Sequence, residues 1–225
     1  VGVGAQPGVP GSGPASAPVV HEPLPPFDVP LTMIEPTLLQ RLYAGDASAG
    51  CRLAVELRRC AMHLRARDYT RHLISRAVRD ENDGRVADVA ALSAAQFEER
   101  EQVLGPVCEG VGRESFDRYH DVLLRTARLG DTMAMVDFAT QAGSLGAEYA
   151  RYPERLAVWH EQAQGWIEQA LRAGEVSAVL PLLLARHGTS AGLLGELLDK
   201  DPVQAHALAL LLLKLSPEFV LHIAT

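Results

Sequence analysis

The stretch Ala127-Arg128-Leu129-Gly130-Asp131, with Ala134 three residues further on, decides the fold of this chain. Helix-favouring residues lead up to the glycine, which can adopt the left-handed conformation that ends a helix. The aspartate that follows can cap the next helix, and the small alanine lets that helix approach its partner closely. The stretch therefore predicts a tight junction between two antiparallel helices.

The same junction recurs elsewhere in the chain. One copy is Leu42-Tyr43-Ala44-Gly45-Asp46 with Ala49, another is Leu171-Arg172-Ala173-Gly174-Glu175 with Ala178, and a fainter one without glycine spans 197–201. Gly130 and Gly174 are 44 residues apart, and the 85 residues from Gly45 to Gly130 are nearly twice that distance. The alternative is chance, since Gly-Asp is common between helices. We favour a repeat array, because a recurrence of this length is typical of stacked helix pairs.

The rest of the chain after residue 31 also has a helical pattern, without the apolar alternation of a strand. We expect the domain 31–225 to be all-α, a superhelical array of antiparallel helix pairs, or α-solenoid, with an irregular middle at about 65–113. The expected helices lie near 36–44, 47–64, 68–80, 85–104, 114–129, 132–142, 153–173, 176–187, 190–198, 202–215 and 217–224.

Residues 131–178 resemble a SEL-type (Sel-one-like) repeat, a relative of the tetratricopeptide repeat. The matching residues are Asp131, Ala134, Phe138, the Gly143–Gly146 loop, Tyr149, Pro153, Leu156, Trp159, Ala163, the Ala173–Glu175 junction and Ala178. The resemblance implies a tetratricopeptide-like stack. The segment from Ala44 to Cys60 also resembles uncharacterised exported helical proteins of gammaproteobacteria, which implies a location more than an activity.

The first 30 residues form a predicted tether. They contain 8 of the 14 prolines and 5 of the 19 glycines but only two charged residues, so they cannot bury enough apolar surface to offset their ordering entropy. We expect a disordered Pro/Gly-rich segment at 1–30. Such a stretch ahead of a folded domain is typical of an exported protein, so we expect a periplasmic or cell-envelope location, with the cytoplasm as the alternative.

The composition excludes some classes of partner. The chain has 225 residues, 48% of them hydrophobic, and a formal charge of −7 from 21 Lys+Arg and 28 Asp+Glu. With no Lys/Arg block, the acidic balance disfavours nucleic acid and mildly favours a basic protein partner. The longest apolar run, Ala207–Leu213, is too short to span a membrane.

The three cysteines suggest one disulfide. Cys51 and Cys60 lie on opposite sides of one expected helix, so they cannot bond to each other. Cys108 is expected in a loop that can reach back to that helix. In an exported protein we expect a bridge from Cys108 to Cys60 or Cys51, whereas in a cytosolic protein all three are small buried residues.

Catalytic patterns are weak. Glu114, Asp117, His120 and Asp121 share a helix face, but a second Glu-x-x-His motif for a di-metal site is missing, so we interpret them as a solvated face. The cysteines and histidines lack the spacing of zinc ligands. We therefore expect no metal, no cofactor and no enzymatic activity.

Four aromatic residues are candidate anchors for a partner: Tyr149, Tyr152, Trp159 and Trp166. Core packing between helix pairs is the usual explanation for such a cluster. Otherwise one of them lines the concave groove of the array and holds a partner.

The apolar C-terminal end, from Ala207 to Leu215 and on to Phe219, Val220, Leu221 and Ile223, must be buried. It either packs within the stack or pairs with a second copy, which makes a homodimer a hypothesis. Together these features predict a non-enzymatic protein-binding or scaffolding module of the bacterial cell envelope. The alternatives are an immunity or inhibitor protein that blocks a toxin or cell-wall enzyme, and an enzyme with an unrecognised metal site at Asp117, His120 and Asp121.

Overall fold

The computed structural model describes residues 23–79, 84–141, 152–189 and 192–215, and every regular element within these ranges is a helix. The all-α fold class is thereby confirmed for the described part of the chain. The helices are α1 (Leu31–Tyr43), α2 (Ala47–Arg79), α3 (Gly84–Cys108), α4 (Arg113–Arg128), α5 (Thr132–Gln141), α7 (Pro153–Arg172), the short 3-10 helix η1 (Val176–Ala178), α8 (Val179–His187), α9 (Leu193–Leu197) and α10 (Pro202–Leu215).

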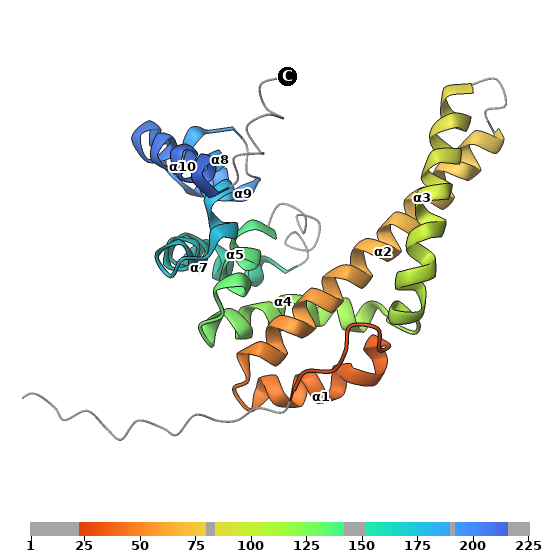
Figure 1. Ribbon diagram of the computed structural model, residues 1–225, viewed down its shortest axis with the longest axis horizontal. Coiled ribbons are helices and arrows are strands. Elements are labelled where there is room, and N and C mark those ends of the chain that lie inside the picture. The colour runs from red at the N-terminus through yellow and green to blue at the C-terminus, as the bar shows by residue number, and fades with distance from the viewer. Residues whose placement is uncertain (1–22, 80–83, 142–151, 190–191, 216–225) are drawn as a thin grey trace, which may run out of the picture.

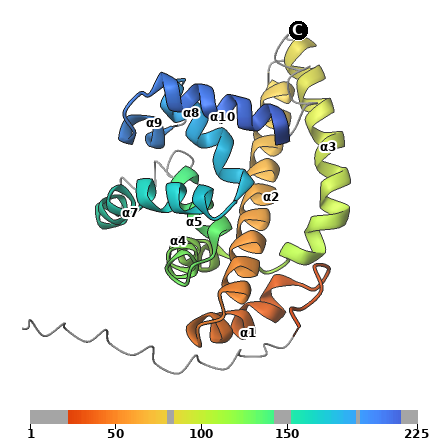
Figure 2. The same ribbon diagram turned by 60° about the vertical axis from the view of Figure 1, so that its left-hand side comes forward.

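Two parts diverge from a common base (Figure 1). The base consists of α1, α4 and the first half of α2, which pack against one another. One part, here called the arm, is the hairpin of α3 and residues 60–79 of α2. The other, here called the stack, continues from α4 through α5, α7, α8 and α10: α5 packs on α4, α7 on α5 and α10 on α8, with η1 between α7 and α8 (Figure 2).

The recurring junction has the predicted geometry in all three strong copies. Gly45, Gly130 and Gly174 have φ angles of 99°, 97° and 88°. A Cβ at any of the three would meet nothing within 4 Å, so the left-handed backbone, rather than crowding, is what requires glycine there. In each copy the glycine N–H bonds back to a carbonyl three residues earlier, which ends the helix.

The acidic residue after each glycine caps the next helix. Asp46 Oδ1 accepts a hydrogen bond from the backbone N–H of Ala49 at 3.1 Å, and Asp131 Oδ1 accepts one from Ala134 at 2.8 Å. In the third copy Glu175 accepts from the N–H of Ser177. The alanines of the motif are buried, as expected for close helix packing. The junction prediction is therefore confirmed down to its hydrogen bonds.

One further glycine marks the closest approach between helices in the base. A Cβ built on Gly50 of α2 would collide with the Thr126 hydroxyl of α4 and lie 2.6 Å from the Leu42 Cδ1 of α1. A larger residue would therefore push three helices apart, and overpacking of this kind destabilises a core. Gly50 fixes how α1, α2 and α4 meet.

A continuous core runs from the base through the stack. Its largest fully buried members include Leu38 of α1, Leu53 of α2, Phe138 of α5 and Leu182 of α8. The distal arm contributes almost nothing to this core, although Leu73 and Ala90 are buried between α2 and α3. The arm therefore depends on contacts between its own two helices.

The middle of the chain differs from the prediction. The expected break near residue 65 is absent, and α2 is a single helix of 33 residues. The reason is that residues 51–83 contain neither glycine nor proline, so nothing interrupts the helix. The segment expected to be irregular is a regular helical hairpin over its described residues.

Two helix ends also need correction. Helix α1 begins at Leu31 rather than near Pro36, because Leu31 and Ile34 are buried in the core and extend the helix backwards. Helix α3 runs to Cys108, past Pro106, so Cys108 is not in a loop. Proline removes one helical hydrogen bond, but burial of Val107 and Cys108 favours the extra turn. The last expected helix, 217–224, lies outside the described residues.

Candidate functional site

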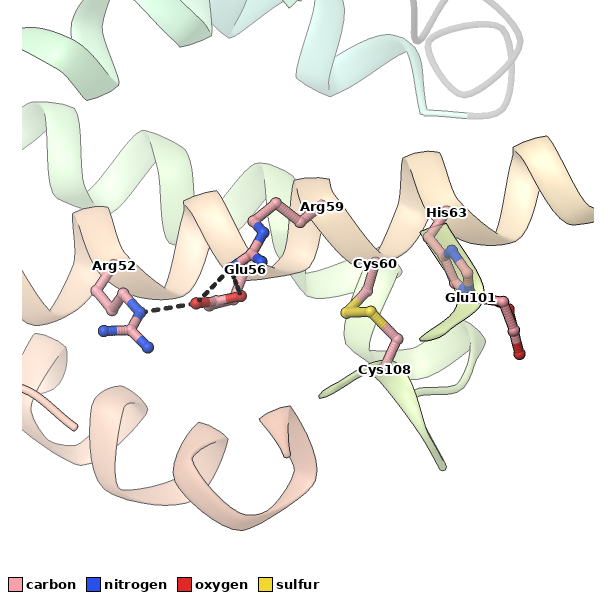
Figure 3. The surroundings of a disulfide bond; sticks show 7 residues. All are labelled: Arg52, Glu56, Arg59, Cys60, His63, Glu101 and Cys108. Carbon is pink, nitrogen blue, oxygen red and sulfur yellow. Dashed lines mark hydrogen bonds and ion pairs between the residues drawn. A yellow bond between two sulfur atoms is a disulfide. The ribbon is translucent and has the colours of Figure 1, made fainter. Parts of the chain in front are cut away.

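A disulfide joins the two helices of the arm where the arm meets the base. Cys60 of α2 and Cys108 at the end of α3 have their sulfur atoms 2.08 Å apart and their Cα atoms 5.3 Å apart (Figure 3). Of the two partners left open for Cys108, the structure places Cys60 beside it. The bridge lies where the arm leaves the base, so it fixes the point from which the hairpin projects.

Cys51 is the cysteine left free, and it is only partly buried. Desolvation, followed by the negative charge of Asp131, raises the pKa of its thiol to about 12. The thiol therefore stays protonated at neutral pH. Because the thiolate is the nucleophilic form of cysteine, Cys51 is poorly suited to covalent catalysis.

A buried histidine ties the two helices of the arm together one turn beyond the disulfide. His63 Nε2 lies 2.8 Å from the Glu101 carboxylate, and its ring stacks on Phe97 with centroids 5.3 Å apart. His63 and Glu101 line an open hollow of about 500 Å³, together with Arg67, Glu109 and the Cys108 end of α3. These contacts stiffen the base of the arm.

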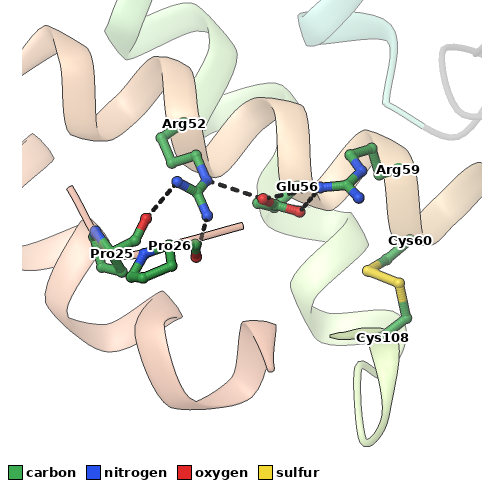
Figure 4. Close-up of polar contacts among 7 residues, drawn as sticks. All are labelled: Pro25, Pro26, Arg52, Glu56, Arg59, Cys60 and Cys108. Atoms are coloured by element: carbon green, nitrogen blue, oxygen red, sulfur yellow. Dashed lines mark hydrogen bonds and ion pairs between the residues drawn. A yellow bond between two sulfur atoms is a disulfide. The ribbon is translucent and has the colours of Figure 1, made fainter. Parts of the chain in front are cut away.

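The segment before α1 lies against α2 (Figure 4). The Arg52 guanidinium donates to the carbonyls of Pro25 and Pro26 at 2.6 and 2.7 Å, and its Cζ lies 3.5 Å from the centre of the Phe27 ring. Arg52 is buried and paired with Glu56 at 2.9 Å. We expected residues 23–30 to belong to the disordered tether, but Pro25, Pro26 and Phe27 make specific contacts with Arg52. The physical reason is that a buried guanidinium needs hydrogen-bond acceptors, and the two carbonyls supply them. Residues 1–22 of the tether lie outside the described residues.

The constellation on α4 does not form a metal site. His120 is buried and tilts against the Phe138 ring at 5.5 Å, so it is not on a solvated face, whereas the side chains of Glu114 and Asp121 are 93% and 66% exposed. Asp121 lies 3.7 Å from Arg155 of α7. Across the described part of the chain, no group of three or more His, Cys, Asp or Glu side chains is placed to hold a metal ion.

The environment of His120 predicts a pH dependence of stability. Burial, followed by the positive charge of Arg155, lowers its pKa from 6.5 to about 4, against the smaller opposing effects of Asp121 and Glu154. The unfolded chain therefore takes up a proton at higher pH than the folded chain does. Below pH 6.5 this group destabilises the fold, by about 3 kcal/mol at pH 4.

Urea unfolding at pH 7, 5.5 and 4 measures this effect. We expect His120→Gln to lose less stability than the wild type over this range, by about 3 kcal/mol at pH 4. The exposed His160 provides the control, and His160→Gln should follow the wild-type pH profile. If the free energy of unfolding fell equally with pH in all three proteins, His120 would not be the source of the pH dependence.

The candidate anchor residues lie mostly inside the stack. Trp159 is 2% exposed and donates its indole N–H to the Ala139 carbonyl at 3.1 Å. Trp166 is partly buried and packs edge-on against Phe138, with centroids 4.9 Å apart. Tyr152 is half-buried beneath Arg155, and Tyr149 lies outside the described residues. Trp159 and Trp166 thus occupy positions suited to core packing.

The C-terminal helix is only partly covered. Ala205 and Leu208 of α10 are buried against α8, whereas Leu210, Leu211, Leu213 and Leu215 are 37–48% exposed. The expectation that the whole apolar run is buried does not hold for a single copy over the described residues. The homodimer through this face stays a prediction. In the described part of the chain, no helix combines the length and apolar character needed to cross a membrane.

The surface that sequence reasoning missed is on the arm. Large apolar side chains are exposed on both of its helices: Met62, Tyr69 and Val78 on α2, and Leu92 and Val103 on α3 are 59–70% exposed. The signal available in the sequence was the seven-residue spacing of Met62 and Tyr69, which places them on one side of a continuous helix. The arm is therefore the part of the described structure with the most evident capacity to contact another molecule.

Searches with protein-family models, among curated proteins and among solved structures find no match for this chain. The resemblance to SEL-type repeats accordingly stays a prediction, and the geometry of the arm carries the functional proposal.

Proposed function

We propose that this protein is a non-enzymatic protein-binding module of the bacterial cell envelope, and that the arm is its binding element. The observation that carries the proposal is the set of exposed apolar side chains on a hairpin that projects away from the core (Figure 1). Met62 and Tyr69, seven residues apart, share one side of α2, and large apolar side chains exposed side by side mark contact surfaces. Protein association buries such surface.

The base of the arm supports this proposal. The Cys60–Cys108 bridge and the His63–Glu101 pair hold α2 and α3 together where the hairpin begins. A binding element that is ordered before it meets its partner loses less conformational entropy on association. A disulfide is also typical of proteins in oxidising compartments, which favours the periplasm or cell envelope over the cytoplasm.

The three matching junctions support a scaffolding role for the stack. Helix pairs joined at Gly45, Gly130 and Gly174 share the same left-handed glycine and the same acidic cap. We therefore propose that these pairs are related units of a tetratricopeptide-like superhelical array, interrupted by the arm. Such arrays present extended surfaces rather than enclosed pockets.

Affinity capture with matched variants tests the proposal. The tagged full chain, the arm variant Leu92→Asp/Val103→Asp and the stack variant Val176→Asp would each be incubated with native envelope extract. Val176 is also an exposed apolar residue, at 50%, but it lies in η1. We expect one stoichiometric partner to be retained by the wild type and Val176→Asp and to be lost by the arm variant.

Two outcomes would overturn the proposal. Capture of the same proteins by all three baits would show that the arm is not the binding element. A folded wild-type bait that retains no protein would contradict protein binding itself. Circular dichroism of each bait checks that the helical content is unchanged, so that loss of capture reports on the surface.

A further inference from the structure

Positive charge is concentrated on the last two thirds of α2. Residues 58–79 contain seven arginines and one acidic residue, Asp68, a formal charge of +6 in a chain whose total is −7. Because α2 is continuous, all seven arginines lie on one helix. The acidic balance of the whole chain therefore conceals a strongly basic segment.

Four of the seven arginines, Arg58, Arg65, Arg76 and Arg79, share one side of α2 with His72. Seven positions follow one another at alternating steps of four and three residues, and they form what we call the basic stripe: Arg58, Met62, Arg65, Tyr69, His72, Arg76 and Arg79. At 100° per residue these positions fall within about 100° of the helix circumference. The stripe runs for about 31 Å along one side of α2. All of its members beyond Arg58 are exposed.

Arg58, the first member of the basic stripe, pairs with a carboxylate of the stack. Arg58 donates two hydrogen bonds to the Asp137 carboxylate of α5, at 2.8 and 2.9 Å. Burial raises the pKa of Asp137, and the Arg58 guanidinium opposes this and favours the charged carboxylate. The stripe therefore begins with an ion pair in which both oxygens of the Asp137 carboxylate accept from Arg58 Nη1, and its other members continue along the same side of α2.

We propose that the basic stripe binds an acidic amphipathic helix of a partner protein, extending along the arm the contact that Arg58 makes with α5. This inference rests on the proposed function, because it names the chemistry of the partner that the arm would bind. The partner helix would carry Asp or Glu at alternating steps of three and four residues, so that its carboxylates can lie beside Arg65, Arg76 and Arg79 along the stripe.

The composition of the stripe favours a helix over a nucleic acid. Met62 and Tyr69 flank Arg65 in the stripe and are 63% and 59% exposed, which gives a partner helix apolar surface to bury beside the ion pair at Arg65. The 4-3 spacing is also the pattern by which two helices pack along a shared line. The rest of the chain is acidic and would repel an extended polyanion.

A designed peptide tests this proposal with the purified full chain. The probe is a fluorescein-labelled helix of about three heptads with glutamate at alternating three- and four-residue steps on an Ala/Gln background. A second peptide has the same composition, with its glutamates spread around the helix. Fluorescence anisotropy at low salt should show tighter binding of the patterned peptide, by about tenfold.

Arg71 provides a matched control because it is an exposed arginine of α2 that lies outside the stripe. We expect Arg65→Glu to weaken binding of the patterned peptide by about tenfold, because a like charge then faces its carboxylates. Arg71→Glu makes the same change in net charge and should alter binding by less than about twofold. Equal effects of the two variants, or equal binding of the two peptides, would overturn the proposal.

Single-stranded DNA of the same charge is the competing probe. Tighter binding of this DNA than of the patterned peptide, with the same loss in Arg65→Glu, would replace the acidic helix with a nucleic acid. Envelope capture separates this proposal from the one on which it rests. A partner retained by Arg65→Glu but lost by Leu92→Asp/Val103→Asp would refute the basic stripe and leave the arm as a binding element, whereas no captured partner at all would refute both.

Discussion

Removal of the Cys60–Cys108 disulfide is expected to lower the free energy of unfolding by about 4 kcal/mol. The two cysteines are 48 residues apart in the sequence, so the bridge greatly restricts the unfolded chain. The arm adds a second reason. Leu73 and Ala90 are buried outside the main core, so the far end of the hairpin is held only by contacts between α2 and α3, and the covalent link adds to these.

Urea unfolding of Cys60→Ala/Cys108→Ala against the wild type measures this loss. Cys51→Ala is the control, because Cys51 is free and only partly buried, and we expect it to cost less than about 1 kcal/mol. Hydrogen exchange should show the arm opening before the stack in the double variant. A double variant as stable as Cys51→Ala would show that the bridge does not stabilise the fold.

Glu56→Gln is expected to cost about 3 kcal/mol, because it leaves the buried Arg52 guanidinium without its counter-charge. Glu56 is 1% exposed and accepts hydrogen bonds from both Arg52 and Arg59 (Figure 4). The Pro25 and Pro26 carbonyls still accept from Arg52 in this variant, but they carry no net charge. We expect the segment before α1 to loosen as well.

The double variant Arg52→Met/Glu56→Leu tests whether the loss in Glu56→Gln comes from an unpaired buried charge. It removes both charges and should cost less than Glu56→Gln alone, because no unpaired charge is left buried. Glu168→Gln is the surface control. Glu168 pairs with Arg186 at 3.0 Å but is 27% exposed, so we expect a loss of about 1 kcal/mol or less. A Glu56→Gln protein as stable as Glu168→Gln would contradict the prediction.

The sequence predicts those features that depend on a few neighbouring residues. The junctions at Gly45, Gly130 and Gly174 could be derived because the left-handed glycine and the acidic cap act within five residues of each other. The all-α class follows from the same local preferences. By contrast, Leu31 and Ile34 extend α1 through burial, which local preference does not reveal.

The candidate site was harder to predict because its contacts join distant parts of the chain. Arg58 and Asp137 are 79 residues apart, and Arg52 and Pro25 are 27 apart. The expected break near residue 65 also split the basic stripe between two separate helices, which hid its 4-3 spacing. Core packing was the favoured explanation for Trp159 and Trp166 with partner binding as the alternative, and tertiary packing places Trp159 and most of Trp166 inside the stack.

The continuity of α2 has a mechanical consequence. One helix of 33 residues, about 50 Å long, belongs both to the base and to the arm, so any tilt about Cys60 would make it act as a lever. A tilt of about 10° there would swing Arg79 through roughly 5 Å. The short end of this lever carries Arg52, which holds the segment before α1. Tension on that segment would thus be amplified into a displacement at the far end of the hairpin.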